Sequence, residues 1–558
     1  MLGIAGFVGY GSGYLTAQDN SSTLARYSKR ALDRVNELQG KPSQAEQKIA
    51  RIESTFIRFA GEMHSLPQTD YINGGALTVW DEEHLILVTR GGRLLTFTQE
   101  DGLRDMPVQV PDNGVADYTE LSKLPEYENF LHKIYAIRYN DILYVDRPDF
   151  HGFLLSYSFF DVDRVCGGSR IARLDLPRTV EDPSQLSATA EDWRVIFETT
   201  PCLELDPNWT AFDGIMAGGR MDLMSDGRLV YGSGEYHRDG IHTKDLGIQE
   251  PDNSYGKILA IDIDTGAVET LAMGHRNVQG VAVDRDGEIW TIEHAIRGGD
   301  ELNHIRPGEN HGWPDVSLGT LYSGQPLPVI GVEGRHEGYD LPAFAFLPSA
   351  GTSALTSIDN FHPAWDGGLL AGSLSSPEFG QSLYHIRTEG ERVVFVERIK
   401  LERRVRYVQQ WGDKIAMWLD PTDLLILRMD ERKDPLGSAI KAMEAEFPEE
   451  VFRQARNTLN KCAECHSFEQ GNHNGAPSMN GVVGRNVAGV EYGFYSDALA
   501  NLGGVWTEER LKQFLIAPET IAPDSYMPAQ GLSEGPVLDA VIWGLIEADT
   551  TDDEHMKY

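Results

Sequence analysis

The chain has 558 residues, of which 41% are hydrophobic, and this is enough for two or three domains with cores of their own. It carries 85 acidic and 49 basic residues, a formal net charge of −36. Such a surface repels nucleic acids and anionic lipid headgroups. We therefore expect no nucleic-acid partner, and instead a redox or other protein partner with a basic docking face. A charge that serves solubility alone is the alternative.

The N-terminal segment 1–18 is made of apolar, small or uncharged residues, since no charge precedes Asp19. It is short for a membrane span and resembles the core of a signal peptide, although a basic n-region is missing. It is equally consistent with the end of an anchor helix. Both interpretations predict export to the periplasm, as a soluble or an N-terminally membrane-anchored protein. Residues 19–57 carry charges at helical spacing and predict an exposed helical segment.

A turn signal followed by a short β-rich segment recurs six times between residues 58 and 432, each time with a second segment that ends in a polar turn. Asp-Gly and Thr-Gly turns between alternating strands are hairpin signals. Six copies predict a six-bladed β-propeller, with an irregular pair of β-sandwiches as the alternative. The pairs are 81–90 with 92–102, 140–147 with 169–177, 226–234 with 256–266, 286–294 with 300–312, 366–374 with 381–390, and 412–419 with 423–431.

Four cysteines are present, and two of them, Cys166 and Cys202, lie in the predicted propeller. Cys166 comes just before the second segment of the second pair, and Cys202 lies before the third pair. They would form a disulfide in an oxidising compartment. Two buried free thiols are the alternative.

Two segments, GHRNVQG (274–280) and DGEIWTIEHAIRGGDELNHIRPGENHGWP (286–314), resemble the soluble glucose and aldose sugar dehydrogenases that use pyrroloquinoline quinone (PQQ). Residues 74–94, 216–235 and 403–408 are similar to the same family. The resemblance covers about residues 55–432, and the six-bladed fold that it implies agrees with the repeat count. It implies cofactor contacts at Arg276, Asn277, Gln279, Arg404 and Arg406.

PQQ is a flat tricarboxylate quinone, and guanidinium groups suit its carboxylates and carbonyls. For the arginines, a structural ion pair that ties blades together is the alternative. The resemblance also implies a calcium ion beneath the quinone, held partly by backbone carbonyls of a Gly-Pro step. Here that step reads Ala295-Ile296, so the carbonyls remain but the Gly-Pro backbone does not.

The sequence departs from this family at the position of its catalytic base. A histidine is expected four residues before the arginine of a Gly-Arg-Leu step, and Met216 stands there. A thioether cannot accept the proton of a substrate hydroxyl. At the position where the family has a lysine that faces the quinone, this sequence has Ser375. His237 and Asp213 lie nearby in the sequence as replacement candidates, and an early glutamine contact has no match in residues 103–139.

The segment KCAECHSF contains Cys462, Cys465 and His466 at the spacing of c-type haem attachment. Two thioether bonds would hold the porphyrin, and His466 would be the proximal iron ligand. A zinc site would need a second cysteine pair, which this part of the chain lacks. Met527, in PDSYMPAQGL, is the expected distal ligand. Met479 and His473 are rivals that lie closer to His466 in the sequence.

The C-terminal segment resembles class I cytochromes c over about residues 440–548. The resemblance implies that Pro477 backs His466 and that Trp506 lies near a haem propionate. A His/Met pair raises the reduction potential and favours electron transfer over oxygen chemistry. DERKDPLGS predicts a linker at 433–439, between a propeller at 58–432 and an all-α cytochrome c domain at 440–558.

The sequence as a whole predicts a redox fusion. In the first hypothesis, a PQQ-type propeller oxidises a sugar or another alcohol and passes electrons to the covalent haem c. In the second, the protein is an electron-transfer or assembly subunit of a larger complex and its propeller is catalytically silent. The third is a carbohydrate-binding propeller with no redox activity of its own. The side chain at position 216 separates the first two.

Overall fold

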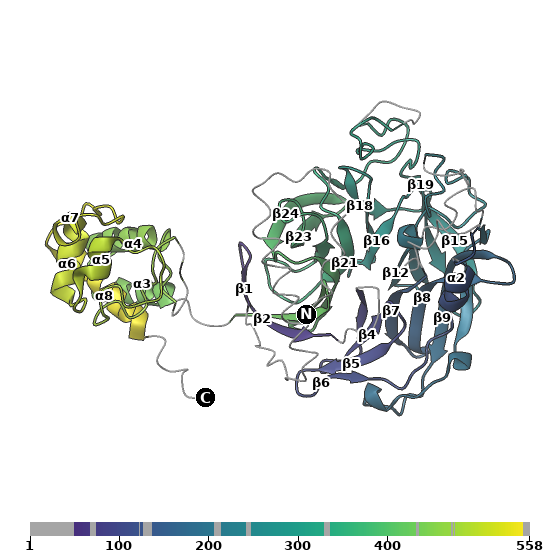
Figure 1. Cartoon of the computed structure of the whole chain (residues 1–558), viewed down its shortest axis with the longest axis horizontal. Helices are drawn as coiled ribbons and strands as arrows, with labels where there is room; N and C mark the ends of the chain where they lie inside the picture. The colour runs from purple at the N-terminus through teal and green to yellow at the C-terminus, as the bar shows by residue number, and fades with distance from the viewer. Residues whose placement is uncertain are drawn as a thin grey trace, which may run out of the picture. The chain divides into compact units, whose positions relative to one another are not determined.

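The computed structural model divides into two compact units between Asp430 and Glu431, and Figure 1 shows a larger β unit and a smaller helical unit. The described residues are 50–66, 74–121, 123–125, 137–205, 214–241, 247–327, 335–430, 435–469, 473 and 475–550. None of the helices in these ranges has the length and apolar character of a membrane span. The predicted signal or anchor segment 1–18 lies outside them.

In the larger unit, the described strands form six sheets, which we call blades 1 to 6. Blade 1 contains β3 (Gly75–Val79), β4 (Leu85–Thr89), β5 (Leu94–Thr98) and β6 (Gly102–Asp105). Blade 2 contains β7 (Tyr139–Asp146), β8 (His151–Asp161), β9 (Cys166–Asp175), β10 (Arg194–Glu198) and β11 (Leu203–Glu204). Blade 3 contains β12 (Gly218–Leu223), β13 (Leu229–Ser233), β14 (Lys257–Ile261), β15 (Val268–Met273) and β19 (Glu309–Asn310).

The chain continues around the ring in the same direction. Blade 4 contains β16 (Val278–Val283), β17 (Ile289–Glu293), β18 (Asp300–Ile305) and β20 (Phe344–Phe346). Blade 5 contains β21 (Thr352–Ile358), β22 (Gly368–Ser373), β23 (Ser382–Glu389) and β24 (Arg392–Lys400). Blade 6 combines β25 (Val405–Trp411), β26 (Lys414–Leu419) and β27 (Asp423–Met429) with the N-terminal β2 (Arg58–Ser65) and β1 (Ala50–Glu53). The predicted six-bladed propeller is therefore confirmed.

Closure of the ring depends on a pairing between the two ends of the propeller. β2 pairs antiparallel with β27 over seven residues, from Phe59 opposite Met429 to Ser65 opposite Asp423. The first strands of consecutive blades also lie side by side, and β25 returns to β3. Because each blade buries both of its faces against its neighbours, the strands read as near-continuous apolar runs, and apolar clusters form between blades. The first strands surround a central cavity of about 390 Å³.

The structure differs from the sequence prediction at three places. Residues 50–53 form strand β1, although a helix was expected through residue 57, because they pair with residues 58–61 of β2. The predicted second pair skips β8, whose almost wholly buried run HGFLLSYSFFD lies between its two members. Pro435, within the expected linker, instead begins a helix, since proline is favoured in a first helical turn and Leu436 and Ala439 are buried in the helical core.

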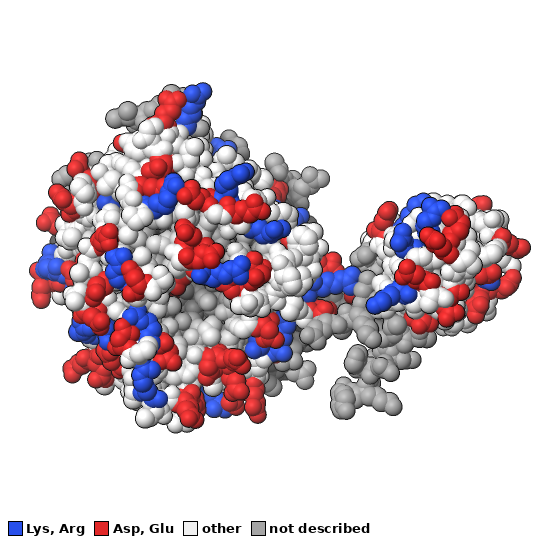
Figure 2. Space-filling view, turned by 180° about the vertical axis from the view of Figure 1, so that it is seen from behind, with Lys and Arg blue, Asp and Glu red and all other residues white. Residues whose placement is uncertain are grey.

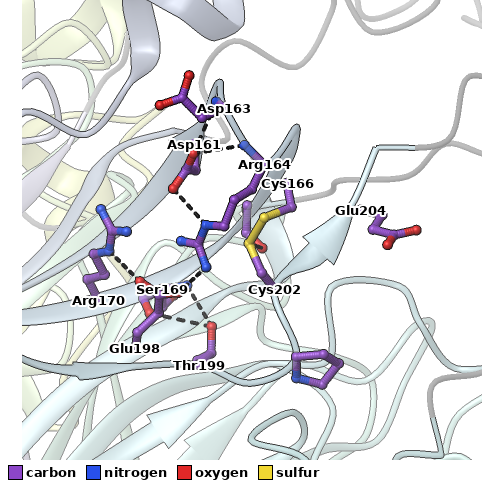
Figure 3. The surroundings of a disulfide bond; sticks show 12 residues. Asp161, Asp163, Arg164, Cys166, Ser169, Arg170, Glu198, Thr199, Cys202 and Glu204 are labelled. Atoms are coloured by element: carbon purple, nitrogen blue, oxygen red, sulfur yellow. Dashed lines mark hydrogen bonds and ion pairs between the residues drawn. A yellow bond between two sulfur atoms is a disulfide. The ribbon is translucent and has the colours of Figure 1, made fainter.

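A disulfide joins Cys166, the first residue of β9, to Cys202, just before β11, as the cysteine count suggested. Figure 3 shows it beside a charge network in which Arg164 contacts both Asp161 and Glu198. Strand β11 pairs with the start of β9, and the disulfide closes this turn covalently. The disulfide therefore holds the chain that leads from blade 2 toward blade 3.

Replacing both Cys166 and Cys202 by alanine should lower the free energy of unfolding of the propeller by about 3–4 kcal/mol, because the disulfide constrains a loop of 36 residues in the unfolded chain. Urea unfolding followed by tryptophan fluorescence measures the loss. The wild type should also be destabilised by dithiothreitol, whereas the double variant should not respond to it. Equal unfolding midpoints for the wild type and the variant would contradict the prediction.

The smaller unit is helical. Its elements are α3 (Pro435–Glu446), α4 (Glu449–Ala463), α5 (Asp497–Leu502), α6 (Glu508–Ile516), α7 (Pro518–Ile521) and α8 (Pro536–Thr550). Helix α8 packs against α3 and α4, with Leu459, Val541 and Leu545 in one buried core. The strongly amphipathic α4 ends just after Cys462, as expected. This arrangement places the Cys-x-x-Cys-His segment at the end of a helix whose apolar face is anchored in the core.

Candidate functional sites in the two units

A cavity of about 740 Å³ opens in the smaller unit, within the range of about 300–1,000 Å³ that is usual for cofactor sites. Its wall includes Cys462, Cys465, His466 and Met527, all named from the sequence. Cys462 is buried and burial raises the pKa of its thiol to about 11, whereas Cys465 is exposed. Two thiols, an imidazole and a thioether around one mostly apolar cavity fit a c-type haem.

The imidazole of His466 is oriented by a hydrogen bond to a backbone carbonyl. Its Nδ1 lies 2.6 Å from the carbonyl oxygen of Pro477. An isolated parallel β-bridge also pairs the backbone of His466 with that of Ala476. Nδ1 therefore donates to this carbonyl, and Nε2 is left as the lone-pair nitrogen for a metal. Burial lowers the pKa of His466, which favours the neutral, ligating form. Pro477 thus contributes through its carbonyl oxygen.

The three candidates for the distal ligand differ in position. Met527 and Met479 both line the cavity, but His473 does not. The backbone N–H of Met479 donates to Ser467, next to His466, so Met479 belongs to the loop on the proximal side. Nδ1 of His473 instead accepts a hydrogen bond from the backbone N–H of Ser478. Met527, which follows α7, is the candidate from a separate part of the fold.

Two further side chains line this cavity. Trp506 is buried there, and its backbone N–H donates to the carbonyl of Arg485. Arg485 donates to the carbonyls of Asn480 and Ser478, and burial lowers the pKa of its guanidinium. The sequence analysis missed Arg485. It brings a cation to a cavity where the haem group would bring propionate charges.

In the larger unit, two of the residues implied by the resemblance, Gln279 and Arg406, lie around Arg220, at the third position of β12. Its guanidinium donates to backbone carbonyls of four other first strands: Asn140 in β7 at 3.1 Å, Gln279 in β16 at 3.1 Å, Ser353 in β21 at 3.4 Å and Arg406 in β25 at 3.2 Å. It also lies 4.5 Å above the ring of Tyr407. One cation thus ties five blades together. The backbone carbonyls of Gln279 and Arg406 both accept hydrogen bonds from this one guanidinium.

Arg276 is held by the core of blade 4. Its backbone N–H donates to Glu293, which also contacts Nδ1 of His275 at 2.8 Å. Burial tends to raise the pKa of Glu293, but the charge and hydrogen bond of His275 lower it overall. Asn277 is also buried, and its side chain accepts a hydrogen bond from Gln279. The GHRNVQG segment is therefore held in place by packing and by hydrogen bonds within the protein.

The guanidinium of Arg276 occupies the position where calcium was expected. Its Nη1 donates to the carbonyl oxygens of His294 at 3.1 Å and Ala295 at 2.7 Å. A calcium ion would have to displace this guanidinium from the Ala295 oxygen, and Ile296 lies in an apolar cluster. The described residues contain no group of three or more His, Cys, Asp or Glu side chains placed to hold a metal. The calcium site expected at the backbone carbonyls of Ala295 and Ile296 therefore stays a prediction, with the Ala295 oxygen engaged by Arg276 in this structure.

The Arg-x-Arg pair has two different environments. Arg406 forms a two-pronged ion pair with Asp420, at 2.8 and 2.6 Å, whereas Arg404 is exposed. Both partners of the ion pair belong to blade 6, so it does not tie two blades together as the alternative suggested. The two nitrogens of Arg406 that would suit a carboxylate already contact one.

At the position of the missing base, Met216 is buried in the short 3₁₀ turn Gly214–Met216. Its carbonyl accepts a hydrogen bond from the N–H of Tyr236, and the N–H of Glu235 donates to the carbonyl of Arg276. The turn at Tyr236 and His237 has left-handed backbone angles, with φ of 54° and 56°. His237 thus lies in a turn whose backbone contacts both Met216 and Arg276. The other replacement candidate, Asp213, lies outside the described residues.

Ser375 is half-buried, and its backbone N–H donates to the carbonyl of Ala350. A second cation that the sequence analysis did not name, Arg90, lies near Arg406, since a Cβ atom on Gly74 would meet the side chains of both. Burial, together with the neighbouring guanidinium groups of Arg138, Arg406 and Arg220, lowers the pKa of Arg90 well below its ordinary value, whereas Asp420 acts in the opposite direction. This end of the axis therefore concentrates positive charge in a strongly acidic chain.

A six-bladed propeller joined to a helical unit with a Cys-x-x-Cys-His cavity defines a dehydrogenase-type propeller fused to a cytochrome c. The family model for glucose/sorbosone dehydrogenases matches residues 147–425, half of the chain, and the chain belongs to this family. An uncharacterised protein of Synechocystis is 30% identical over 285 residues, which are 47% of this chain and 65% of that protein. Aldose sugar dehydrogenase YliI of Escherichia coli is 28% identical over 364 residues, 61% of this chain and 84% of the relative.

The solved structures agree on the propeller. A glucose dehydrogenase structure gives a TM-score of 0.51 at 25% identity and covers 66% of this chain and 99% of its own. For the C-terminal unit, cytochrome c2 of Agrobacterium tumefaciens is 37% identical over 90 residues, 15% of this chain and 81% of the relative. The expected fusion of a sugar-dehydrogenase-type propeller with a class I cytochrome c domain is therefore confirmed.

Proposed function

We propose that this protein transfers electrons through a covalently bound haem c, and that the electrons come from a sugar or another alcohol oxidised at the propeller with PQQ. The observation that carries the proposal is the cavity lined by Cys462, Cys465, His466 and Met527, in a chain whose other unit belongs to a sugar dehydrogenase family. A fused acceptor has a high effective concentration for its donor. The haem c would therefore compete well with free acceptors.

In the propeller, PQQ would accept the hydride equivalent of the alcohol carbon, two electrons and one proton in total. The residues at the axis would supply binding and proton transfer. Arg406 and Arg276 would orient carboxylates or carbonyls if they released Asp420 and the Ala295 carbonyl. His237, beside Met216, is the first candidate for the base that removes the hydroxyl proton. The chain would then pass the electrons singly to the haem iron.

The test is reconstitution of the purified, haem-loaded protein with PQQ, with and without calcium. Haem reduction is followed by absorbance as a panel of aldoses and polyols is added. Reduction that needs both PQQ and a sugar supports the proposal. An absence of PQQ binding at micromolar concentration would overturn the enzymatic part and leave electron transfer with a silent propeller. That second function is favoured by Met216 at the base position and by the occupied guanidinium groups of Arg276 and Arg406.

We also propose a periplasmic location, which the expected covalent haem and the disulfide support. Covalent haem attachment takes place after export, and disulfides persist in oxidising compartments. The Cys166–Cys202 disulfide therefore supports a periplasmic location. Anchoring through the N-terminus would be compatible with the same location. Fractionation of cells that express the full chain, with and without a carbonate wash, distinguishes a soluble from an anchored protein.

The electron acceptor is proposed to have a basic docking face. Residues 436–558 contain 19 acidic and eight basic residues, a net charge of −11. Figure 2 shows acidic side chains across the visible face of both units, with basic ones between them. A basic partner would be steered toward such a surface.

Electron transfer to a basic acceptor protein should therefore slow as salt rises. The charges are screened beyond about 30 Å at 10 mM ionic strength and beyond about 8 Å at 150 mM. Stopped-flow oxidation of the reduced haem by a basic and by an acidic cytochrome, each over this salt range, provides the comparison. The rate with the basic acceptor should fall and that with the acidic acceptor should rise. Equal salt dependence for both acceptors would argue against charge-guided docking.

A further inference from the structure

Arg90 is a cation of the axial cluster to which the resemblance assigns no cofactor contact. It follows β4, and its backbone links two blades, because its N–H donates to Gly74 and its carbonyl accepts from Tyr139. A Cβ atom on Gly74 would lie 3.3 Å from Nε of Arg90 and 3.4 Å from Cγ of Arg406. The side chains of Arg90 and Arg406 therefore both lie against Gly74.

The neighbours of Arg90 already have their counter-charges. Both oxygens of Asp420 accept from Arg406, and Arg220 lies 3.7 Å from Asp141 while it donates to four carbonyls. The half-buried side chain of Arg90 makes no hydrogen bond or ion pair with any other described residue. With Arg138, four guanidinium groups thus lie near two carboxylates, those of Asp420 and Asp141. A partly desolvated cation among like charges is unfavourable unless an anion compensates it.

We propose that Arg90 binds a carboxylate group at this end of the propeller. The inference rests on the proposed function, because the carboxylate would belong either to the tricarboxylate cofactor or to an acidic sugar substrate. Arg90 would also compensate for a positive charge that the family has elsewhere and this chain lacks. Ser375 stands where the resemblance implies a lysine, and Arg90 would supply a cation from blade 1 that position 375 in blade 5 does not. A planar guanidinium can hold both oxygens of a carboxylate.

The test compares the full-length, haem-loaded wild type with Arg90→Gln, which keeps the size of a polar side chain and removes the charge. Arg104→Gln is the matched control, since Arg104 is an exposed arginine of the same blade that pairs with Asp101. PQQ is titrated and its binding followed by tryptophan fluorescence. Glucuronate and glucose are titrated calorimetrically. Loss of a charge-assisted hydrogen-bond pair should weaken binding by about 10-fold to 100-fold.

Weaker binding of PQQ to Arg90→Gln alone assigns the carboxylate to the cofactor. Weaker binding of glucuronate, with glucose unaffected, assigns it to a substrate. If the wild type binds glucuronate but not PQQ, the proposed quinone enzymology fails while the carboxylate site stands. Unchanged affinity of Arg90→Gln for both probes, or no binding of either probe to the wild type, would overturn the inference. If Arg90→Gln does not fold, Arg90→Lys replaces it in the same titrations. This variant keeps the charge but not the two-pronged contact, so its affinity should fall by less.

Discussion

Replacing Met216 by histidine is expected to raise the rate of sugar oxidation by the PQQ-loaded protein by about 10²–10⁴-fold, the usual contribution of a general base. Met216 occupies the position at which the family resemblance implies the base, and its thioether cannot accept a proton. The substitution also places a polar ring at a buried position. Initial rates of haem reduction with saturating aldose measure the effect, and PQQ affinity is measured separately to exclude a change in loading.

The pH profile distinguishes a new base from a change in packing. An imidazole acts as a base only when neutral, so the gain should grow as pH rises through the histidine pKa of about 6.5 and then level off. Met224→His, in the turn after β12, places a histidine in the same blade at the opposite end of this strand from Met216 and should leave the rate unchanged. Ordinary turnover by the wild type would contradict our interpretation of position 216. His237→Asn should then be the slow variant.

The propeller was predictable because each of its turns is encoded by a few neighbouring residues. Asp-Gly and Thr-Gly steps repeat between short apolar segments, and each marks a hairpin without reference to the rest of the chain. Strand β8 was missed because its apolar run has no turn signal of this kind. The pairing of β2 with β27 was also missed, since nothing near Phe59 or Met429 indicates a partner more than 300 residues away. Ring closure is a property of the whole chain.

The two candidate sites were predictable to different degrees for the same reason. The thiols and the imidazole of the smaller unit lie within five residues, so their spacing alone indicates haem attachment. The propeller site is assembled from residues of several blades, and the sequence could name only those that the resemblance implied. It did not show that Asp420 would engage Arg406, that Arg276 would take the Ala295 carbonyl, or that Arg90 would join them. Those contacts follow from the radial packing of the blades.

Replacing Met527 by alanine should remove the weak thioether-to-iron absorption band of the oxidised haem protein and lower its reduction potential. Axial ligands set haem potentials over a range of about 0.8 V, and a thioether favours the reduced iron. Met527 lies in the wall of the cavity that contains His466. Loss of its sulfur would leave water or a stronger base as the sixth ligand, and both stabilise the oxidised iron. Redox titration and absorbance of the oxidised protein measure the two effects.

Met479→Ala is the matched control, because Met479 lines the same cavity but its loop hydrogen-bonds next to His466 on the proximal side. It should keep the absorption band and most of the potential, while it loses stability because a buried side chain is truncated. Both variants should retain haem after acid-acetone extraction, since Cys462 and Cys465 are intact. An unchanged spectrum for Met527→Ala together with a lost band for Met479→Ala would transfer the ligand role to Met479. Both iron ligands, His466 and Met479, would then come from one short stretch of the chain.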